Sequence, residues 1–373
     1  MTPRRWTLVG PAWPWRGGIA HFQLATARAL AARGHRVDAV TFRRQYPDRL
    51  FPGRSQFDDG PPPSDQPIAP QLLDPISPGS WLRAARAIPG QVAVLMVWMP
   101  FFAPMLGVIA RRLRARGVRV LAVVHNALPH ERRPGDRMLT RWMLRACDGI
   151  VAMSEQVARD VGALGIGAPL EVVPHPTYDG FGEPVPRARA RAALALPADV
   201  PVFLFFGFIR RYKGLDVLLD AWAEVLHHVP DARLVVAGEF YADEEALRRQ
   251  AASLGASVRL DADYIPDERV AAYFGAADAV VQPYRTATQS GVAQIAFHFG
   301  RPVVTSDVGG LAEVVPDGVA GRVVPPEDPA ALAGALVAFV RGQQGPRLEA
   351  GVAVERQRYT WERLAEALER LAG

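Results

Sequence analysis

The segment from Phe205 to Asp216 (FFGFIRRYKGLD) combines residue types that bind phosphate. An apolar strand ends at Gly207, Arg210 and Arg211 follow, and an amphipathic helix begins directly after Lys213. Arginine offers a fork of N–H donors, and lysine offers a compact positive charge. The start of a helix offers backbone N–H groups that have no partner within the helix. Lys213 is the only lysine in a chain that has 42 arginines. The segment predicts a phosphate site, with a solvated basic turn as the alternative.

A second polar segment, Pro283 to Ala296 (PYRTATQSGVAQIA), lies between another buried strand and a helix. Hydroxyl groups, an amide and a glycine collect where this helix begins, so they predict a second anion cradle. These residues are Thr286, Thr288, Gln289, Ser290 and Gly291. An ordinary turn is the alternative.

The run Gly300 to Val315 (GRPVVTSDVGGLAEVV) follows directly and contains a glycine pair and an acid. Gly309 and Gly310 would let the backbone approach a ligand closely. The carboxylate of Glu313 could accept a hydrogen bond from a sugar hydroxyl. Glycine pairs most often form turns, which is the alternative here.

In the first half, Leu121 to Glu131 (LAVVHNALPHE) places polar side chains directly after a buried strand. His125, Asn126 and His130 could bond a substrate hydroxyl there, and a histidine could act as acid or base. The alternative is that these histidines are hydrogen-bonded structural groups.

Two common cofactor patterns are missing from the chain. The glycine loop Gly10 to His21 (GPAWPWRGGIAH) lacks the G-x-G-x-x-G spacing of dinucleotide sites, which disfavours a hydride-transfer enzyme. Asp261 and Asp263 are spaced like paired aspartates that hold a divalent ion, but they stand at the end of an expected strand and we do not expect a metal there. We expect neither a metal nor an organic cofactor.

The elements that must position these residues alternate between apolar strands and helical patterns, which predicts parallel sheets with helices on both faces. The expected strands are Thr7–Gly10, Arg36–Phe42, Val92–Trp98, Arg119–Val124, Gly149–Met153, Val202–Phe206, Ala232–Ala237, Ser257–Asp261, Ala279–Gln282 and Pro302–Ser306. Arg43 to Ser80 is proline-rich and is expected to be irregular. A linker from Val172 to Pro186 separates two doubly wound domains, and ligands would bind in the cleft between them.

The uncharged run Val92 to Ala110 is nearly long enough to span a membrane. Pro100 and Pro104 argue against a span and favour a strand, a loop and the start of a helix.

The length suggests two domains, and the composition is that of an ordinary globular protein. The chain has 373 residues, of which 49% are hydrophobic and 22% charged, and its net charge is +5. These values exclude collagen-like, disordered and disulfide-rich classes. The single cysteine, Cys147, and a start without an apolar signal core favour the cytoplasm. We expect no nucleic-acid partner.

Together these segments resemble the retaining glycosyltransferases of family 4, which have the GT-B fold of two Rossmann-like domains facing each other across a cleft. The resemblance is carried by the Gly17–Gly18 loop, the RGHRV turn from Arg33, His125, the G-x-I-R-x-Y-K-G element, GAADAVVQPY, GRPVVTSDVGGLAEVV and the closing YTWERLAEAL. It implies an acceptor-side domain over residues 1–178, a donor domain over 179–357 and a helix over 358–373 that crosses back to the first domain.

The resemblance also implies roles for individual residues. Arg210 and Lys213 would bind the diphosphate of a nucleotide sugar and act with His125, which would contact the transferred sugar. Further donor contacts would come from Gly17, Gly18, Gly207, Gly238, Tyr264, Thr288, Gln289, Ser290 and Gly291. Sugar or acceptor contacts would come from His21, Asn126, His130 and Glu313.

The chain departs from the family pattern in three places. Members usually carry two glutamates eight positions apart, and the equivalent positions here are Ala287 and Ile295. Phe208 stands where an arginine commonly follows the strand-end glycine, so Arg210 would substitute for it. A subgroup with a TQSG loop is the appropriate comparison, with Gln289, Ser290 and backbone amides holding the donor.

The expected function is metal-independent retaining transfer of a sugar from a nucleotide diphosphate sugar to a glycan or lipid-linked acceptor, as in cell-surface polysaccharide or glycolipid synthesis. The alternatives are a binding or scaffold protein with reduced catalysis, and a nucleotide-sugar epimerase or hydrolase. Basic segments at Gly107–Arg119 and Arg132–Ala146 favour peripheral contact with anionic lipid at the inner face of the membrane, with a solvated helix face as the alternative.

Overall fold

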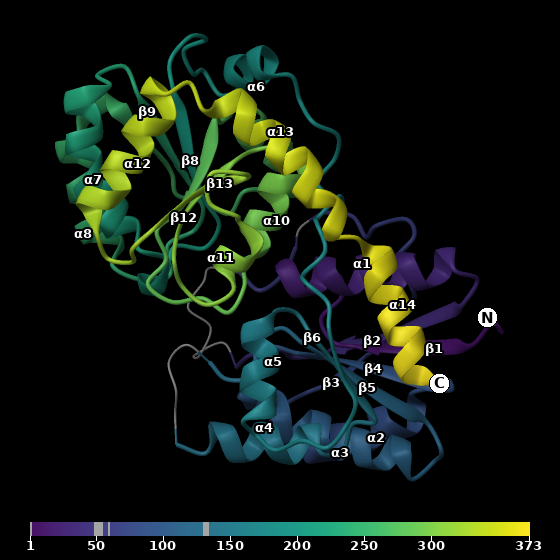
Figure 1. The fold of residues 1–373 in the computed structure, drawn as a ribbon. Coiled ribbons are helices and arrows are strands. Elements are labelled where there is room, and N and C mark those ends of the chain that lie inside the picture. Colours follow the sequence, from purple (N-terminus) through teal and green to yellow (C-terminus); the bar gives the residue numbers. More distant parts are fainter. Residues whose placement is uncertain (1, 48–54, 59, 130–133) are drawn as a thin grey trace. The chain divides into compact units, whose positions relative to one another are not determined.

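The computed structural model describes residues 2–47, 55–58, 60–129 and 134–373. These residues form two compact units (Figure 1). Unit 1 consists of Met1–Pro176 and Thr360–Gly373, and unit 2 consists of Thr177–Tyr359. Each unit is an α/β layer structure around one parallel sheet.

Unit 1 contains a seven-stranded sheet with strand order β3-β2-β1-β4-β5-β6-β7. The strands are β1 (Arg5–Val9), β2 (Arg36–Phe42), β3 (Gln71–Leu73), β4 (Val92–Val97), β5 (Arg119–Val124), β6 (Gly149–Ala152) and β7 (Leu170–Val172). The helices are α1 (Gly18–Ala32), α2 (Pro78–Ala87), α3 (Ala103–Arg114), α4 (Asp136–Leu144), α5 (Glu155–Gly162) and α14 (Trp361–Ala372). All strand pairs are parallel, as the alternating pattern predicts.

The uncharged run from Val92 to Ala110 forms three elements, which confirms the strand, loop and helix reading. Every residue of β4 is buried because helices cover both faces of the sheet. A 3-10 turn over Pro100–Phe102 follows, and α3 begins at Ala103. Among the described residues, no helix is both long and apolar enough to cross a membrane.

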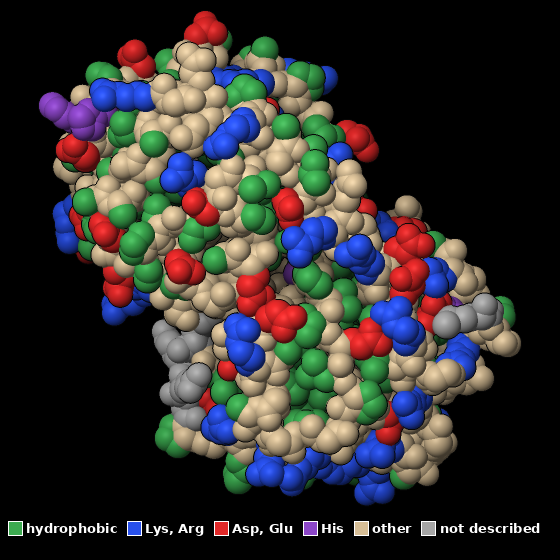
Figure 2. All heavy atoms as spheres, in the orientation of Figure 1, with side chains coloured by type: hydrophobic (Ala, Val, Ile, Leu, Met, Phe, Trp, Pro, Cys, Tyr) green, Lys and Arg blue, Asp and Glu red, His purple; other side chains and the backbone are tan. Residues whose placement is uncertain are grey.

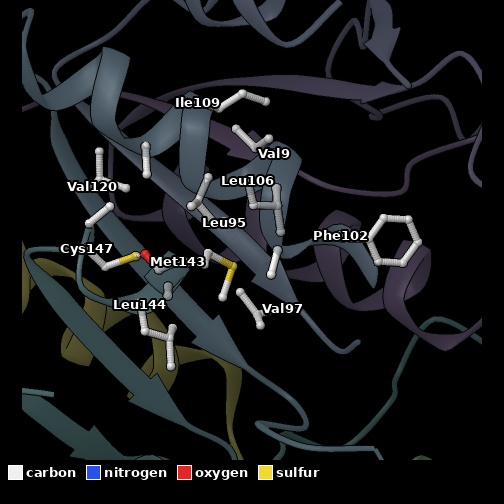
Figure 3. Close-up of a cluster of buried hydrophobic side chains, with 14 of the residues drawn as sticks. Val9, Leu95, Val97, Phe102, Leu106, Ile109, Val120, Met143, Leu144 and Cys147 are labelled. Carbon is white, nitrogen blue, oxygen red and sulfur yellow. Dashed lines mark hydrogen bonds between the residues drawn. The ribbon is translucent and has the colours of Figure 1, made fainter. Parts of the chain in front are cut away.

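The core of unit 1 lies between the sheet and the helices α3 and α4. Figure 3 shows side chains of β4, α3 and α4 that meet there, including Leu95, Leu106 and Met143. Cys147 lies in the same cluster, and burial raises the pKa of its thiol to about 12, so it is an inert core residue. On the other face of the sheet, α14 lies beside α1 and also packs against β5 and β6 (Figure 1).

Unit 2 contains a six-stranded sheet with strand order β10-β9-β8-β11-β12-β13. The strands are β8 (Val202–Phe206), β9 (Arg233–Ala237), β10 (Val258–Asp261), β11 (Ala279–Gln282), β12 (Val303–Ser306) and β13 (Gly321–Val324). The helices are α6 (Arg187–Ala193), α7 (Leu215–His228), α8 (Glu244–Ser253), α9 (Asp267–Ala276), α10 (Gly291–His298), α11 (Leu311–Val314), α12 (Pro329–Arg341) and α13 (Gly345–Glu355). The strand order reverses between β8 and β11, and such a switch point is where doubly wound sheets bind ligands.

Candidate functional site

The two polar segments of unit 2 meet at this switch point. The segment with the lone lysine follows β8, and the TQSG segment follows β11, which pairs with β8. Since both strands are parallel, both segments leave the same edge of the sheet.

Lys213 is the central residue of the β8 segment. It ends a 3-10 turn (Arg211–Lys213), and its ammonium nitrogen lies 3.0 Å from the position that a Cβ atom on Gly207 would take. Gly207 has φ +91°, a conformation that favours glycine. The Lys213 side chain is only 7% exposed, and burial together with the nearby charge of Arg210 lowers its pKa to about 7.

This burial disfavours the solvated basic turn that stands as the alternative in the sequence. The Lys213 side chain is enclosed, and its ammonium group lies 5.7 Å from the centroid of the Tyr284 ring. A buried amine of lowered pKa at a switch point is typical of a functional group rather than of a solvated turn.

Arg285 joins the two segments, and no pattern in the sequence distinguishes it among 42 arginines. Its backbone N–H donates to the Tyr212 carbonyl (2.7 Å), and its guanidinium donates to the Arg211 carbonyl (2.9 Å). The same guanidinium forms a bidentate pair with Asp216 (2.8 and 2.6 Å), which lowers the pKa of that carboxyl. Arg285 is therefore occupied in shaping the site.

The helix α10 begins at the TQSG segment and presents backbone donors to the same region. Ser290 is its N-cap, and its hydroxyl accepts from the Ala293 N–H (3.4 Å). Ser290 also bonds the side chain of Tyr284, so its hydroxyl has a structural task besides any contact with a ligand. Gly291 is needed for packing, because an added Cβ would lie 3.0 Å from the Tyr178 ring.

Aromatic side chains line the edge of the sheet beside Gly207. The ring of Phe208 lies 4.6 Å from that of Tyr241 and 6.4 Å from that of Tyr264. The guanidinium of Arg210 lies over the Tyr241 ring at 4.9 Å. Gly238 packs directly on the Gly207 carbonyl, where a Cβ atom would not fit. These contacts place Gly238 and Tyr264 next to the β8 segment.

The glycine pair after β12 has a structural explanation. Gly309 has φ +52°, and a Cβ atom there would collide with the Ala287 carbonyl, so a glycine is required where this turn packs on the segment after β11. A ligand contact at Gly309 and Gly310 stays a prediction. Glu313 is exposed on α11.

In unit 1, Gly17 has φ +113° and is the N-cap of α1, so Gly17 and Gly18 form the start of a helix at the edge of the sheet. His21 is half-buried on this helix, and Asn126 is half-buried after β5. His130 lies outside the described residues.

His125 is buried at the end of β5, with 1% of its surface exposed. Burial and the neighbouring His175 lower the pKa of His125 well below its usual value, so the ring is neutral at pH 7. A neutral imidazole can donate or accept a hydrogen bond, but it is a much weaker acid than an imidazolium. A neutral ring at this position therefore favours hydrogen bonding over acid catalysis.

The paired aspartates have protein partners. Asp261 accepts from Arg259 Nε (2.9 Å) and from the Tyr273 hydroxyl (2.7 Å). Within the described part of the chain, no group of three or more acidic, histidine or cysteine side chains could hold a metal ion.

Comparison with known proteins places the chain in a family. The family model Glycosyltransferase Family 4 matches residues 16–177, and the model Glycosyl transferases group 1 matches residues 200–341. D-inositol 3-phosphate glycosyltransferase 1 of Catenulispora acidiphila is 34% identical, over 87% of this chain and 82% of that protein. The chain belongs to glycosyltransferase family 4. A second family 4 relative, D-inositol 3-phosphate glycosyltransferase of Acidothermus cellulolyticus, is 30% identical over 98% of this chain and 89% of its own length.

Solved structures agree with the fold of this family 4 glycosyltransferase. Sucrose-phosphate synthase from Thermosynechococcus elongatus superposes with a TM-score of 0.77 at 22% identity, covering 99% of this chain and 98% of that chain. Anabaena HepE in complex with UDP superposes with a TM-score of 0.75 at 18% identity, covering 98% of this chain and 100% of that chain. The fold is thus GT-B, and the protein is a nucleotide-sugar glycosyltransferase.

Proposed function

We propose that this glycosyltransferase transfers a sugar from a nucleoside diphosphate sugar with retention of anomeric configuration, and that the switch point of unit 2 binds the diphosphate. The observation that carries this proposal is the position of Lys213, a buried amine at the end of β8 beside a glycine. Burial and, after it, the charge of Arg210 lower the pKa of Lys213, so the two cations repel each other. A diphosphate would relieve their repulsion.

The same two cations explain how transfer would proceed without a metal. As the bond between sugar and diphosphate breaks, negative charge develops on the departing group. Arg210 and Lys213 would stabilise that charge, as would the free N–H groups at the start of α10. His125, being neutral, would hydrogen-bond the transferred sugar. Catalysis then rests on positioning and electrostatics.

Unit 1 offers a surface for a lipid-linked acceptor. The helix α3 packs against both α2 and α4, and we give the name arginine face to six exposed arginines on or directly after these helices. They are Arg83, Arg86, Arg112, Arg137, Arg141 and Arg145. The helices α2 and α3 contain no acidic residue. In Figure 2, basic side chains gather along the lower edge of the view, over these helices.

Apolar side chains accompany the arginine face. Met138 is 68% exposed and Trp142 is 38% exposed, both on α4, and Leu82 of α2 is also exposed. The guanidinium of Arg111 lies over the Trp142 ring at 3.8 Å. Arginines beside exposed tryptophan and methionine suit the interface of an anionic bilayer. We include peripheral membrane contact and a lipid-linked acceptor in the proposal.

The names of the curated relatives suggest a second acceptor class. Both relatives are named D-inositol 3-phosphate glycosyltransferases, so a soluble phosphorylated polyol should be among the acceptors that are assayed.

One assay separates transfer from the alternatives. Nucleotide sugars are first screened for thermal stabilisation, and release of nucleoside diphosphate is then measured with and without inositol phosphate, glycan or lipid-linked acceptors. A transferase releases nucleoside diphosphate only with an acceptor, and NMR of the product shows the retained configuration. Release or epimerisation without acceptor indicates a hydrolase or epimerase, and binding without turnover indicates a scaffold protein. Full activity in EDTA is expected.

Flotation with vesicles tests the membrane contact. Protein should float with phosphatidylglycerol vesicles at low salt, less at moderate salt, and not with phosphatidylcholine alone. Arg137→Gln with Arg141→Gln should remove about 2 kcal/mol of binding, roughly a 30-fold loss. The matched control is Arg189→Gln with Arg347→Gln, which removes two exposed arginines of unit 2. Equal loss in both pairs, or no salt-sensitive flotation, contradicts the proposal.

A further inference from the structure

A cluster of aromatic rings surrounds His125 inside unit 1. Phe22 of α1 lies at its centre, with ring centroids 4.4 Å from His125, 5.0 Å from His175 and 5.0 Å from Trp361. His125 and His175 are 6.0 Å apart, and His175 and Trp361 are 6.5 Å apart. We call Phe22, His175 and Trp361 the ring frame of His125.

Two members of the ring frame belong to the segments by which the chain leaves and re-enters unit 1. His175 stands directly before Pro176, the last residue of the first segment of unit 1. Trp361 begins α14 directly after Thr360, the first residue of the second segment. The frame therefore joins both crossing segments to α1 and β5.

The crossing segments are also joined to each other on the side of unit 2. The N–H and the hydroxyl of Thr177 both donate to the Tyr359 carbonyl, at 3.0 and 3.2 Å. Tyr359 is itself buried, and its ring lies 6.0 Å from that of Phe297. Within unit 2, the two crossing segments are thus bonded to each other, and Tyr359 packs in the interior.

The frame also fixes the direction of its rings. Nδ1 of His175 lies 2.7 Å from the Pro176 carbonyl, which can only accept, so Nδ1 carries the proton. The backbone N–H of His125 donates to the Val97 carbonyl (2.8 Å), while its ring meets Phe22 edge to face at 84°. Packing against the frame therefore restricts where the His125 ring points.

We propose that Phe22, His175 and Trp361 are positioning residues that hold the His125 ring and tie its orientation to both crossing segments. The inference rests on the proposed contact between His125 and the transferred sugar. Close-packed interiors transmit displacement, so a shift of either crossing segment moves His175 or Trp361 and, through Phe22, His125.

A double-mutant cycle tests the frame. Trp361→Leu should lower kcat by about tenfold to a hundredfold, because small misplacements of a contacting group are costly. The affinity for nucleoside diphosphate should stay unchanged. Trp361→Phe keeps a ring and should retain most of kcat. In a His125→Ala background, Trp361→Leu should have little further effect, because the residue acts through His125.

Several results would overturn the inference. The first is an unchanged kcat in Trp361→Leu, and the second is an equal reduction of kcat in Trp361→Phe. The third is a reduction of kcat by Trp361→Leu that is equally large in the wild-type and His125→Ala backgrounds. If Trp361→Leu does not fold, Phe22→Leu replaces it in the same double-mutant cycle. NMR of isotope-labelled histidine gives a readout beside activity, since the His125 ring signals should move in Trp361→Leu and less in Trp361→Phe. Full turnover of His125→Ala would instead refute the proposed role of His125 itself.

Discussion

The ammonium nitrogen of Lys213 lies 3.0 Å from the point that a Cβ atom on Gly207 would occupy. A side chain at position 207 would therefore crowd the amine of the lone lysine. Gly207 leaves room for this amine and also has φ +91°, a conformation that favours glycine.

Replacing Gly207 tests this requirement. Gly207→Ala should displace the Lys213 amine and weaken nucleoside diphosphate binding at least tenfold, measured by calorimetry. Gly255→Ala is the matched control, because Gly255 also has positive φ (+64°) but an added Cβ there meets nothing within 4 Å. Both variants carry backbone strain of about 1 kcal/mol or more, yet only the first should lose affinity. Equal affinities would contradict the relationship.

The two cations of the site should contribute separately to donor binding. Arg210→Ala and Lys213→Met should each cost about 1.5 to 3 kcal/mol, which is roughly a tenfold to hundredfold loss in affinity or in kcat/KM. Methionine is chosen at position 213 because the side chain is buried there. The control is Arg211→Ala, since Arg211 is exposed and pairs with Asp243 (2.7 Å). A folded Lys213→Met variant with wild-type kcat/KM would refute the assignment.

Lys213 should also give the stability a pH dependence. Its pKa in the folded chain is about 7, below the ordinary value of 10.5, so the unfolded chain binds more protons between these values. The free energy of unfolding of the wild type should therefore rise with pH over this window. The Lys213→Met variant has no amine that titrates at this position. Its free energy of unfolding, measured by chemical denaturation, should exceed that of the wild type most below pH 7, and this difference should vanish towards pH 10.5. A constant difference across the range would contradict the buried amine.

The C-terminal helix should be acid-sensitive through Glu369. Its carboxylate accepts two hydrogen bonds from Arg33 (2.8 and 2.7 Å) and lies 2.8 Å from His35 Nε2. The bonds from Arg33 and His35 lower the pKa of Glu369 to about 2. Because the folded pKa is depressed, this stabilisation is present above about pH 4.5 and is lost as the pH falls towards 2.

Glu369→Gln should therefore lower the free energy of unfolding at neutral pH by up to about 3 kcal/mol, and the difference from wild type should shrink in acid. Glu362→Gln is the control, because the Glu362 side chain is exposed and its carboxylate lies 3.6 Å from Arg33, farther than that of Glu369. Equal effects of the two substitutions would contradict a special role for Glu369.

The strands that carry the site could be predicted because they are continuous apolar runs with clear ends. The predicted ranges of β5, β8 and β11 match the structure residue for residue. β3, β7 and β13 were missed, since each is short and none has a continuous apolar pattern between clear ends. Such short edge strands are specified by their neighbours rather than by their own sequence.

The placement of side chains was harder to predict than that of strands. The composition of FFGFIRRYKGLD indicates phosphate binding, but not that Lys213 is enclosed while Arg211 points to solvent. Arg285 was missed because its task is defined by Asp216, 69 positions away in the chain. The ring frame of His125 combines residues from three distant segments, and no local pattern marks such contacts.

The most direct test of the phosphate site uses Lys213 as its own probe. Growth on lysine labelled with ¹³C at Cε gives one side-chain signal, because the chain has one lysine. Without nucleotide, this signal should titrate with a pKa near 7. Saturating nucleoside diphosphate should raise that pKa by a unit or more, since an adjacent anion favours the charged amine. A signal that titrates near 10.5 in both states, or one that bound nucleotide leaves unmoved, would contradict the account.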